Sequence, residues 1–172
     1  MGIKSEGAGN RSKPHLDCEG ARPPDCSRAI EFWMDKTPIS PNRLIGRHWA
    51  AKHRERDEWM VWLRASLTPE QIVALREASG AAHPANHFGA QQMRGEIHIV
   101  QPKHLFDEDN LEASVKPLLD AMTAVGLIWN DSPRWLLRPR ATQELAKHCC
   151  RSDGKPGTRV RIAKADEEAL PR

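Results

Sequence analysis

The sequence predicts a single α+β domain in which a small mixed β-sheet packs with helices. Segments with alternating apolar residues and segments with apolar residues at helical spacing follow one another in the order β, α, α, β, α, β, β. The length of 172 residues suits one domain with a core and tails. We expect the folded domain at residues 28–165, between a flexible arm at 1–27, rich in Gly, Pro, Ser and charge, and a tail at 166–172.

Composition narrows the class of protein. The formal net charge of +3 permits nucleic-acid binding but does not require it. No apolar run approaches the roughly 20 residues of a membrane helix, and the N-terminus lacks the apolar segment of a signal peptide, so we expect a cytoplasmic protein with no membrane partner. The cysteines have spacings that match no usual zinc motif, and we expect free thiols at Cys18, Cys26, Cys149 and Cys150.

The first predicted strand precedes a long predicted helix. Ile30, Phe32 and Met34 alternate within residues 29–34, which indicates a strand with these side chains on one face. A turn-rich loop follows. Apolar residues at helical spacing then predict a helix over residues 49–67.

Capping residues mark both ends of a second helix. Thr68 is the predicted N-cap, Pro69 the first helical residue, and Gln71 reaches back to the cap. Gly80 is the residue type that ends a helix in the left-handed conformation. These signals predict a helix between Pro69 and Gly80.

Three later segments read as strands. The segment 93–102 alternates, with Ile97 and Ile99 on one face. Two further strands are predicted at 134–142 and 158–165, separated by a loop that contains Gly and Pro. They complete the mixed sheet.

The most informative segment is "FDEDNLEASVKPLLDAMTAVGLIWND", which lies between the second and third predicted strands. If its middle is helical, Asp109, Lys116 and Asp120 share one face. The apolar residues share the opposite face; they are Leu111, Val115, Leu118, Met122 and Val125. Pro117 leaves two alternatives open: the helix kinks there, or it begins near Lys116 with Pro117 as its first residue.

The end of this segment is expected to turn back toward the sheet. Gly126 has the position of a C-terminal helix cap. Residues 127–129 are predicted to start a short strand, followed by a turn that contains Asp131.

Two carboxylates at the start of the segment are close enough to share a cation. Asp107 and Asp109 flank one residue, and alternate residues of an extended chain point the same way. Like charges raise each other's pKa unless a cation compensates them, and Mg²⁺ prefers oxygen ligands of this kind. Asp131 joins the pair only if the chain folds back on itself.

A simpler explanation of the same acids remains open. Asp109 or Asn110 is also suited to cap the helix. Lys116 and Asp120 have the spacing of an i,i+4 ion pair on a solvated helix face.

The motif D-E-D-N-L, then K-P-L-L-D-A-M, then G-L-I-W-N-D-S resembles the RusA-type Holliday junction resolvases, endonucleases common in phages and prophages. The likeness is strongest over residues 106–132, and residues 37–49 resemble the Pro-x-Ser-x-Asn segment of that family. The resemblance implies a RusA-like fold. It also implies a homodimer that cleaves four-way DNA junctions with Mg²⁺, for which Mn²⁺ can substitute.

The resemblance also assigns roles to individual residues. The metal-binding acids and the essential lysine, together the catalytic set, match Asp107, Asp109, Asp131 and Lys116. Supporting residues match Asn110 and Asp120. Basic residues around the first helix and the acidic segment either contact DNA phosphates or form a solvated face; they are Arg43, Arg47, Lys52, Arg54, Arg56 and Lys103.

Rival functions follow from the same residues. A nuclease of this fold could act on other branched or flap substrates. A catalytically silent module that binds branched DNA is a second rival, because Lys116 lies seven residues after Asp109, a longer gap than in the best-known family member. A phage interaction protein without DNA affinity is the third.

Overall fold

Strand β2 (Met93–Gln101) runs through the middle of a five-stranded mixed sheet. It pairs antiparallel with β5 (Gly157–Lys164), which in turn pairs antiparallel with β1 (Ile30–Met34). Its other side pairs in parallel with two short strands, β3 (Leu136–Leu137) and β4 (Thr142–Leu145). The computed structural model describes residues 29–43, 49–82, 90–149 and 154–165.

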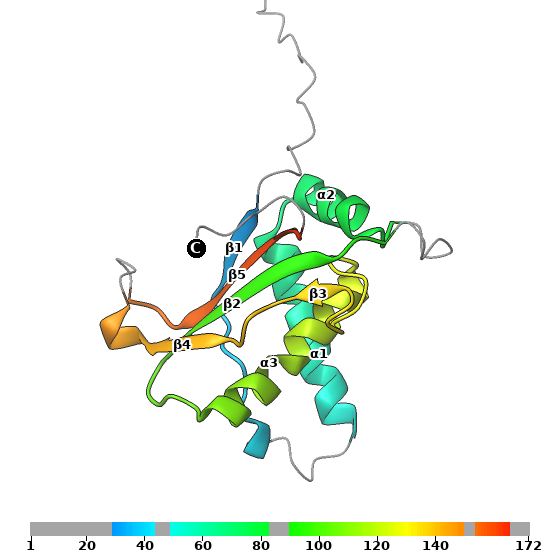
Figure 1. Ribbon diagram of the computed structural model, residues 1–172. Helices are drawn as coiled ribbons and strands as arrows, with labels where there is room; N and C mark the ends of the chain where they lie inside the picture. Colours follow the sequence, from blue (N-terminus) through cyan, green and yellow to red (C-terminus); the bar gives the residue numbers. More distant parts are fainter. Residues whose placement is uncertain (1–28, 44–48, 83–89, 150–153, 166–172) are drawn as a thin grey trace, which may run out of the picture.

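Helices cover one face of the sheet (Figure 1). Helix α1 (Trp49–Ser66) packs against α3 (Glu108–Val125) and β1. Helix α2 (Pro69–Ser79) lies near the end of the sheet at which β2 begins (Figure 1). A short 3₁₀ turn, η1 (Pro41–Arg43), contacts α3. The predicted α+β class is therefore confirmed.

Alternation along the strands divides the sheet into a core face and an open face. Phe32 and Met34 of β1, and Ile97 and Ile99 of β2, are buried under the helices, as the alternation predicted. Their neighbours on the opposite face, such as Glu31, are more exposed. This division leaves the second face of the sheet without a covering layer among the described residues.

The second helix has the predicted caps. The Thr68 side chain accepts a hydrogen bond from the Gln71 backbone N–H, and the Gln71 side chain accepts one from the Thr68 N–H. Gly80 ends the helix with φ 78°. The reciprocal bonds satisfy two N–H groups that a helix start otherwise leaves unpaired.

Helix α3 settles the two alternatives at Pro117, because it continues from Glu108 to Val125 with Pro117 inside it. An interior proline destabilises a helix by about 3 kcal/mol. Val115, Leu118 and Met122 are nearly or completely buried. Burial of each stabilises the fold by about 1.5–3 kcal/mol, so tertiary packing outweighs the local penalty.

Two expectations for the region after α3 are wrong. Residues 127–129 form a bend and not a strand, and Leu127 and Ile128 are both fully buried in the core. The single strand predicted at 134–142 is instead two short strands, β3 and β4, on either side of Pro139. Proline has no N–H to donate to the neighbouring strand.

Some predicted features lie outside the described residues. They are the arm at 1–27, the tail at 166–172, Arg47 and the three cysteines other than Cys149. Cys149 forms no disulfide within the described part of the chain, in agreement with the prediction. Among the helices that the structure describes, none combines the length and the apolar character needed to cross a membrane.

Candidate functional site

Asp107 caps the N-terminus of α3. Its carboxylate accepts a hydrogen bond of 2.8 Å from the backbone N–H of Asn110 and a second bond from the Asn110 side chain. The backbone bond and then the side-chain bond hold the pKa of Asp107 below its ordinary value. A cap was expected at Asp109 or Asn110, so the structure moves this role to Asp107 and makes Asn110 its partner.

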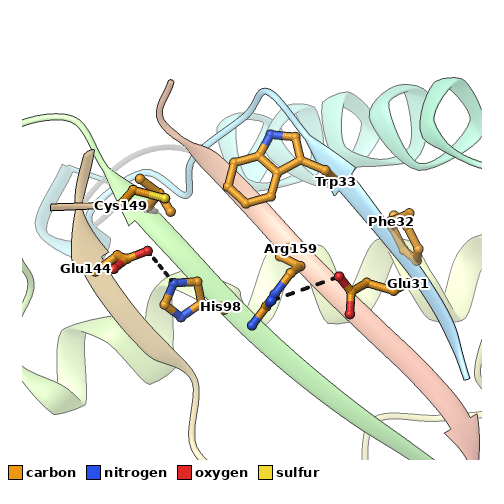
Figure 2. Close-up of a pocket in the computed structure, with 8 residues that line it drawn as sticks. Glu31, Phe32, Trp33, His98, Glu144, Cys149 and Arg159 are labelled. Carbon is orange, nitrogen blue, oxygen red and sulfur yellow. Dashed lines mark hydrogen bonds and ion pairs between the residues drawn. The ribbon is translucent and has the colours of Figure 1, made fainter. Parts of the chain in front are cut away.

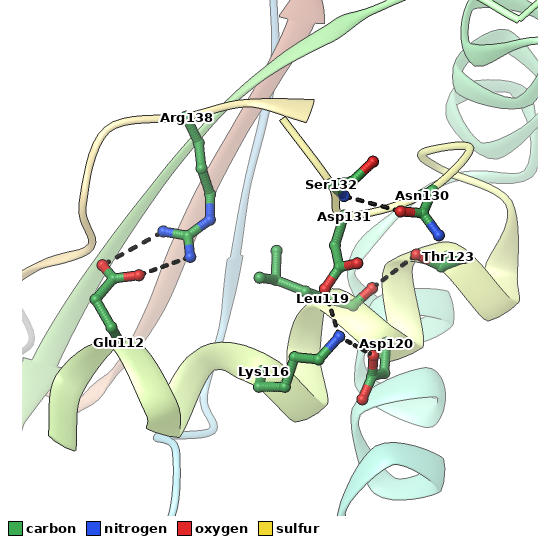
Figure 3. A network of polar contacts seen from close by, with 9 residues as sticks. All are labelled: Glu112, Lys116, Leu119, Asp120, Thr123, Asn130, Asp131, Ser132 and Arg138. Carbon is green, nitrogen blue, oxygen red and sulfur yellow. Dashed lines mark hydrogen bonds and ion pairs between the residues drawn. The ribbon is translucent and has the colours of Figure 1, made fainter. Parts of the chain in front are cut away.

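Lys116 stands between two carboxylates on the exposed face of α3 (Figure 3). Its ammonium donates to Asp120 at 2.8 Å, one turn further along the helix, and also donates to Asp131. Burial opposes the charged form of Lys116, but the hydrogen bonds and negative charges of Asp120 and Asp131 outweigh it, so the pKa of Lys116 is raised. Both the i,i+4 pair and the return of Asp131 to the helix are therefore observed.

The turn after α3 brings Asp131 to this position. Gly126 ends the helix with φ 86°, a left-handed conformation that other residues rarely adopt. Leu127 and Ile128 then anchor the chain in the core. The Asn130 side chain accepts a hydrogen bond of 2.9 Å from the Ser132 N–H, which closes the turn around Asp131 (Figure 3).

The predicted site residues fall into two groups. Lys116, Asp120 and Asp131 are bonded together, whereas Asp107 is bonded to Asn110 at the start of the helix. Asp109 is exposed in the first turn of α3. Within the described residues, no three His, Cys, Asp or Glu side chains are grouped so that they could hold a metal ion. A shared ion for Asp107, Asp109 and Asp131 stays a prediction.

The donor chemistry beside Lys116 nevertheless suits Mg²⁺. Asp120 and Asp131 already converge on one positively charged group. Mg²⁺ is commonly bound through one or two carboxylates, with waters and substrate phosphates as its other ligands. Asp120, expected only as a supporting residue, therefore lies where a metal ligand could act.

A second ion pair on α3 was not foreseen from the sequence. Glu112 accepts two hydrogen bonds from the Arg138 guanidinium, at 2.7 and 3.4 Å (Figure 3). It accepts a third from the Ala141 backbone N–H. Burial raises the pKa of Glu112, but the bonds from Arg138 and Ala141 outweigh it and leave the pKa lowered. This pair ties the β3–β4 connection to α3. No local spacing signals it, because Glu112 and Arg138 are 26 residues apart in the chain.

The basic residues proposed to hold DNA are dispersed. Arg43 and Lys103 are exposed and line one cleft. Arg54 is exposed on α1, and Arg56 forms an ion pair of 2.8 Å with its neighbour Asp57. The side chain of Lys52, like Arg47, lies outside the described residues.

The open face of the sheet carries a separate cleft of about 450 Å³ (Figure 2). His98 contacts Glu144 at 3.2 Å, and hydrogen bonds from the Cys149 thiol and then from His98 lower the pKa of Glu144. Arg159 lies 4.0 Å from Glu31 across the same cleft. Acidic and basic groups thus face each other in this cleft.

Comparisons of this chain with models of known protein families, with curated proteins and with solved structures found no match.

Proposed function

We propose that this chain is a Mg²⁺-dependent, structure-specific endodeoxyribonuclease of the RusA type that resolves Holliday junctions in the cytoplasm. The observation that carries the proposal is the position of Lys116, which bonds to both Asp120 and Asp131 on an exposed face of α3. A lysine between two carboxylates suits phosphodiester hydrolysis, in which negative charge accumulates on the phosphate.

Each residue has a role in this proposal. Asp107, Asp109 and Asp131 would hold Mg²⁺, with Asp120 close to Asp131, and Mn²⁺ could substitute. Mg²⁺ bound there would lower the pKa of a water ligand and neutralise charge on the phosphate. The ammonium of Lys116 provides a point charge that steadies the attacking water or the phosphate oxygens. Water adds to phosphorus while one P–O bond breaks, which leaves a phosphate end and a hydroxyl end.

The proposed substrate comes from the resemblance to the RusA-type resolvases, and the proposed assembly matches the symmetry of that substrate. Arginine and lysine side chains neutralise DNA phosphates, which gives affinity that depends on salt and little on sequence. A four-way junction has two-fold symmetry, and its resolution requires paired incisions. A homodimer with two-fold symmetry supplies the two sites.

One observation favours a second candidate, a catalytically silent module that binds branched DNA. The carboxylate of Asp107 is already bonded to Asn110, and the described residues contain no group of three metal-binding side chains. A protein that kept the fold but lost its metal site would look like this. It would bind junctions and produce no metal-dependent product.

A junction-cleavage assay separates the two candidates. Wild-type protein is incubated with a labelled four-way junction, a fork, a flap and a linear duplex, with Mg²⁺ or with EDTA. We expect Mg²⁺-dependent cleavage of the junction, loss of cleavage in Asp131→Asn and Asp109→Asn with binding retained, and no effect of Glu77→Gln, an exposed acid on α2. Junction binding without any product would favour the silent module, and cleavage of the fork or flap alone would change the substrate.

A further inference from the structure

A cleft of about 310 Å³ opens between the chain after β1 and the connection from β2 to α3. Arg43 lies on one side of it, and Gln101 and Lys103 lie on the other. Phe106 also lines the cleft and directly precedes Asp107, the cap of α3. The cleft therefore adjoins the acidic start of α3.

The charge of this cleft is positive. No Asp or Glu is among the described residues that line it, in contrast to the cleft on the open face of the sheet, where Glu31 and Glu144 take part. Arg43 and Lys103 are both exposed, and within the described part of the chain neither forms an ion pair. The group that suits these two cations is an anion.

A buried amide adds a hydrogen-bond donor to the cleft. Gln101 is only 3% exposed, and its Nε2 has no acceptor among the described residues. An unpaired buried donor destabilises a fold by about 1–3 kcal/mol. The terminal torsion of Gln is broad, so a small rotation can direct this N–H toward an oxygen held by Arg43 and Lys103.

The walls of the cleft are fixed in place and partly apolar. Lys36, just before the loop, forms ion pairs with Glu55 at 3.2 Å and Glu58 at 2.9 Å on α1. The carbonyl of Lys36 accepts a hydrogen bond of 2.7 Å from the Thr158 hydroxyl. Proline and aromatic side chains also line the cleft, at Pro38, Pro102 and Phe106. A sugar attached to the anion would find an apolar surface there.

We propose that this cleft binds one phosphodiester group of a DNA strand, beside the acidic start of α3. Arg43 and Lys103 contact its oxygens, the Gln101 amide donates a hydrogen bond, and the sugar lies against the apolar wall. The inference rests on the proposed function, because a strand held here passes next to the acids that would cut it. The cleft would position the substrate and is separate from the catalytic residues.

Equilibrium binding without cleavage tests the proposal. A fluorescently labelled four-way junction is titrated in EDTA at several salt concentrations, and its anisotropy gives the dissociation constant and the salt slope. We expect Arg43→Gln and Lys103→Gln each to lower the slope by about 0.9, because each removes one phosphate contact. Gln101→Met should weaken binding roughly tenfold and leave the slope unchanged, because it removes a hydrogen bond to a charged group but no charge.

The matched control is Arg64→Gln, an exposed arginine in the last turn of α1, which should leave both quantities unchanged. Thermal unfolding of each variant checks the fold. Arg43 and Lys103 are exposed, so we expect their variants to fold, and they test the proposal even if Gln101→Met unfolds. If both charge variants bind the junction with the same salt slope as the wild type, the cleft does not bind phosphate, and the nuclease proposal still stands. Absence of DNA binding by the wild type would overturn both.

Discussion

Lys116 and Asp131 are fifteen residues apart in the chain, and the ammonium of the first donates a hydrogen bond to the carboxylate of the second. The same ammonium bonds to Asp120 at 2.8 Å. The side chain of Lys116 is 55% exposed, so this ion pair adds little to stability. Its value lies in holding three charged groups of the candidate site next to one another.

Replacement of the lysine should separate its chemical role from folding. We expect Lys116→Gln to reduce junction cleavage by about a hundredfold or more, the effect of losing one preorganised charge in an active site. Junction binding and the melting temperature should change little, because the ion pair is exposed. Gel-based cleavage rates measure the effect, and Lys147→Gln, an exposed lysine on the 3₁₀ turn after β4, is the control. If Lys116→Gln cleaves the junction as fast as the wild type, Lys116 is not a catalytic residue.

Asp107 has two proposed roles, which two substitutions distinguish. Asn caps a helix about as well as Asp but carries no charge, whereas Ala neither caps a helix nor carries a charge. We expect Asp107→Asn to keep the wild-type melting temperature but lose cleavage. Asp107→Ala should have a lower melting temperature and also lose cleavage. Circular dichroism during heating and the cleavage assay give the two readouts. Full activity in Asp107→Asn would leave this residue as a helix cap alone.

The pair of Glu112 and Arg138 should make stability depend on pH. Because the pKa of Glu112 is lowered in the folded protein, its contribution is complete above its unfolded value of about 4.5 and is lost as pH falls through the lower folded value. We expect Glu112→Gln to lower the free energy of unfolding by roughly 1.5–3 kcal/mol at pH 7. Urea titrations at several pH values should show this difference shrinking in acid. A difference that grew below pH 4.5 would contradict the assignment.

Gly126 connects backbone conformation to the position of Asp131. An added Cβ would meet the Arg76 side chain at 3.2 Å, and the left-handed conformation alone disfavours a non-glycine residue by about 1–2 kcal/mol. We expect Gly126→Ala to lose roughly that much stability in urea and also to lose junction cleavage, because the turn that carries Asp131 shifts. Gly154→Ala is the comparison: its φ is also positive, at 56°, and apart from its chain neighbours no described residue has an atom within 4 Å of the added Cβ. Equal cleavage by the two variants would show that this turn does not set the site.

Much of the fold was predictable because its signals are local. Thr68, Gln71 and Gly80 bound α2 through hydrogen bonds among near neighbours in the chain. Phe32, Met34, Ile97 and Ile99 alternate as a strand with one buried face requires, and the structure buries them. The i,i+4 contact between Lys116 and Asp120 also depends only on helix geometry.

Other features were decided by packing. The sequence left open whether α3 crosses Pro117, and the buried apolar face of the helix settled it. Leu127 and Ile128 looked like strand residues, but they form a buried bend with which none of the described strands pairs. The long strand expected before and after Pro139 became β3 and β4. An unfavourable free energy at one residue, such as Pro117, can be outweighed by contacts with residues far away in the chain. A short stretch of sequence does not contain those contacts.

The sequence alone determined the class of fold, the caps of α2 and the stripe of charge along α3, because each follows from backbone periodicity and from hydrogen bonds between near neighbours. Only the tertiary structure decided that Asp131 returns to Lys116, that Glu112 binds Arg138, and that Arg43 faces Lys103 across a cleft. These contacts join residues far apart in the chain. Their positions depend on how the helices and the sheet pack, and that packing is the sum of many burials spread over the whole domain.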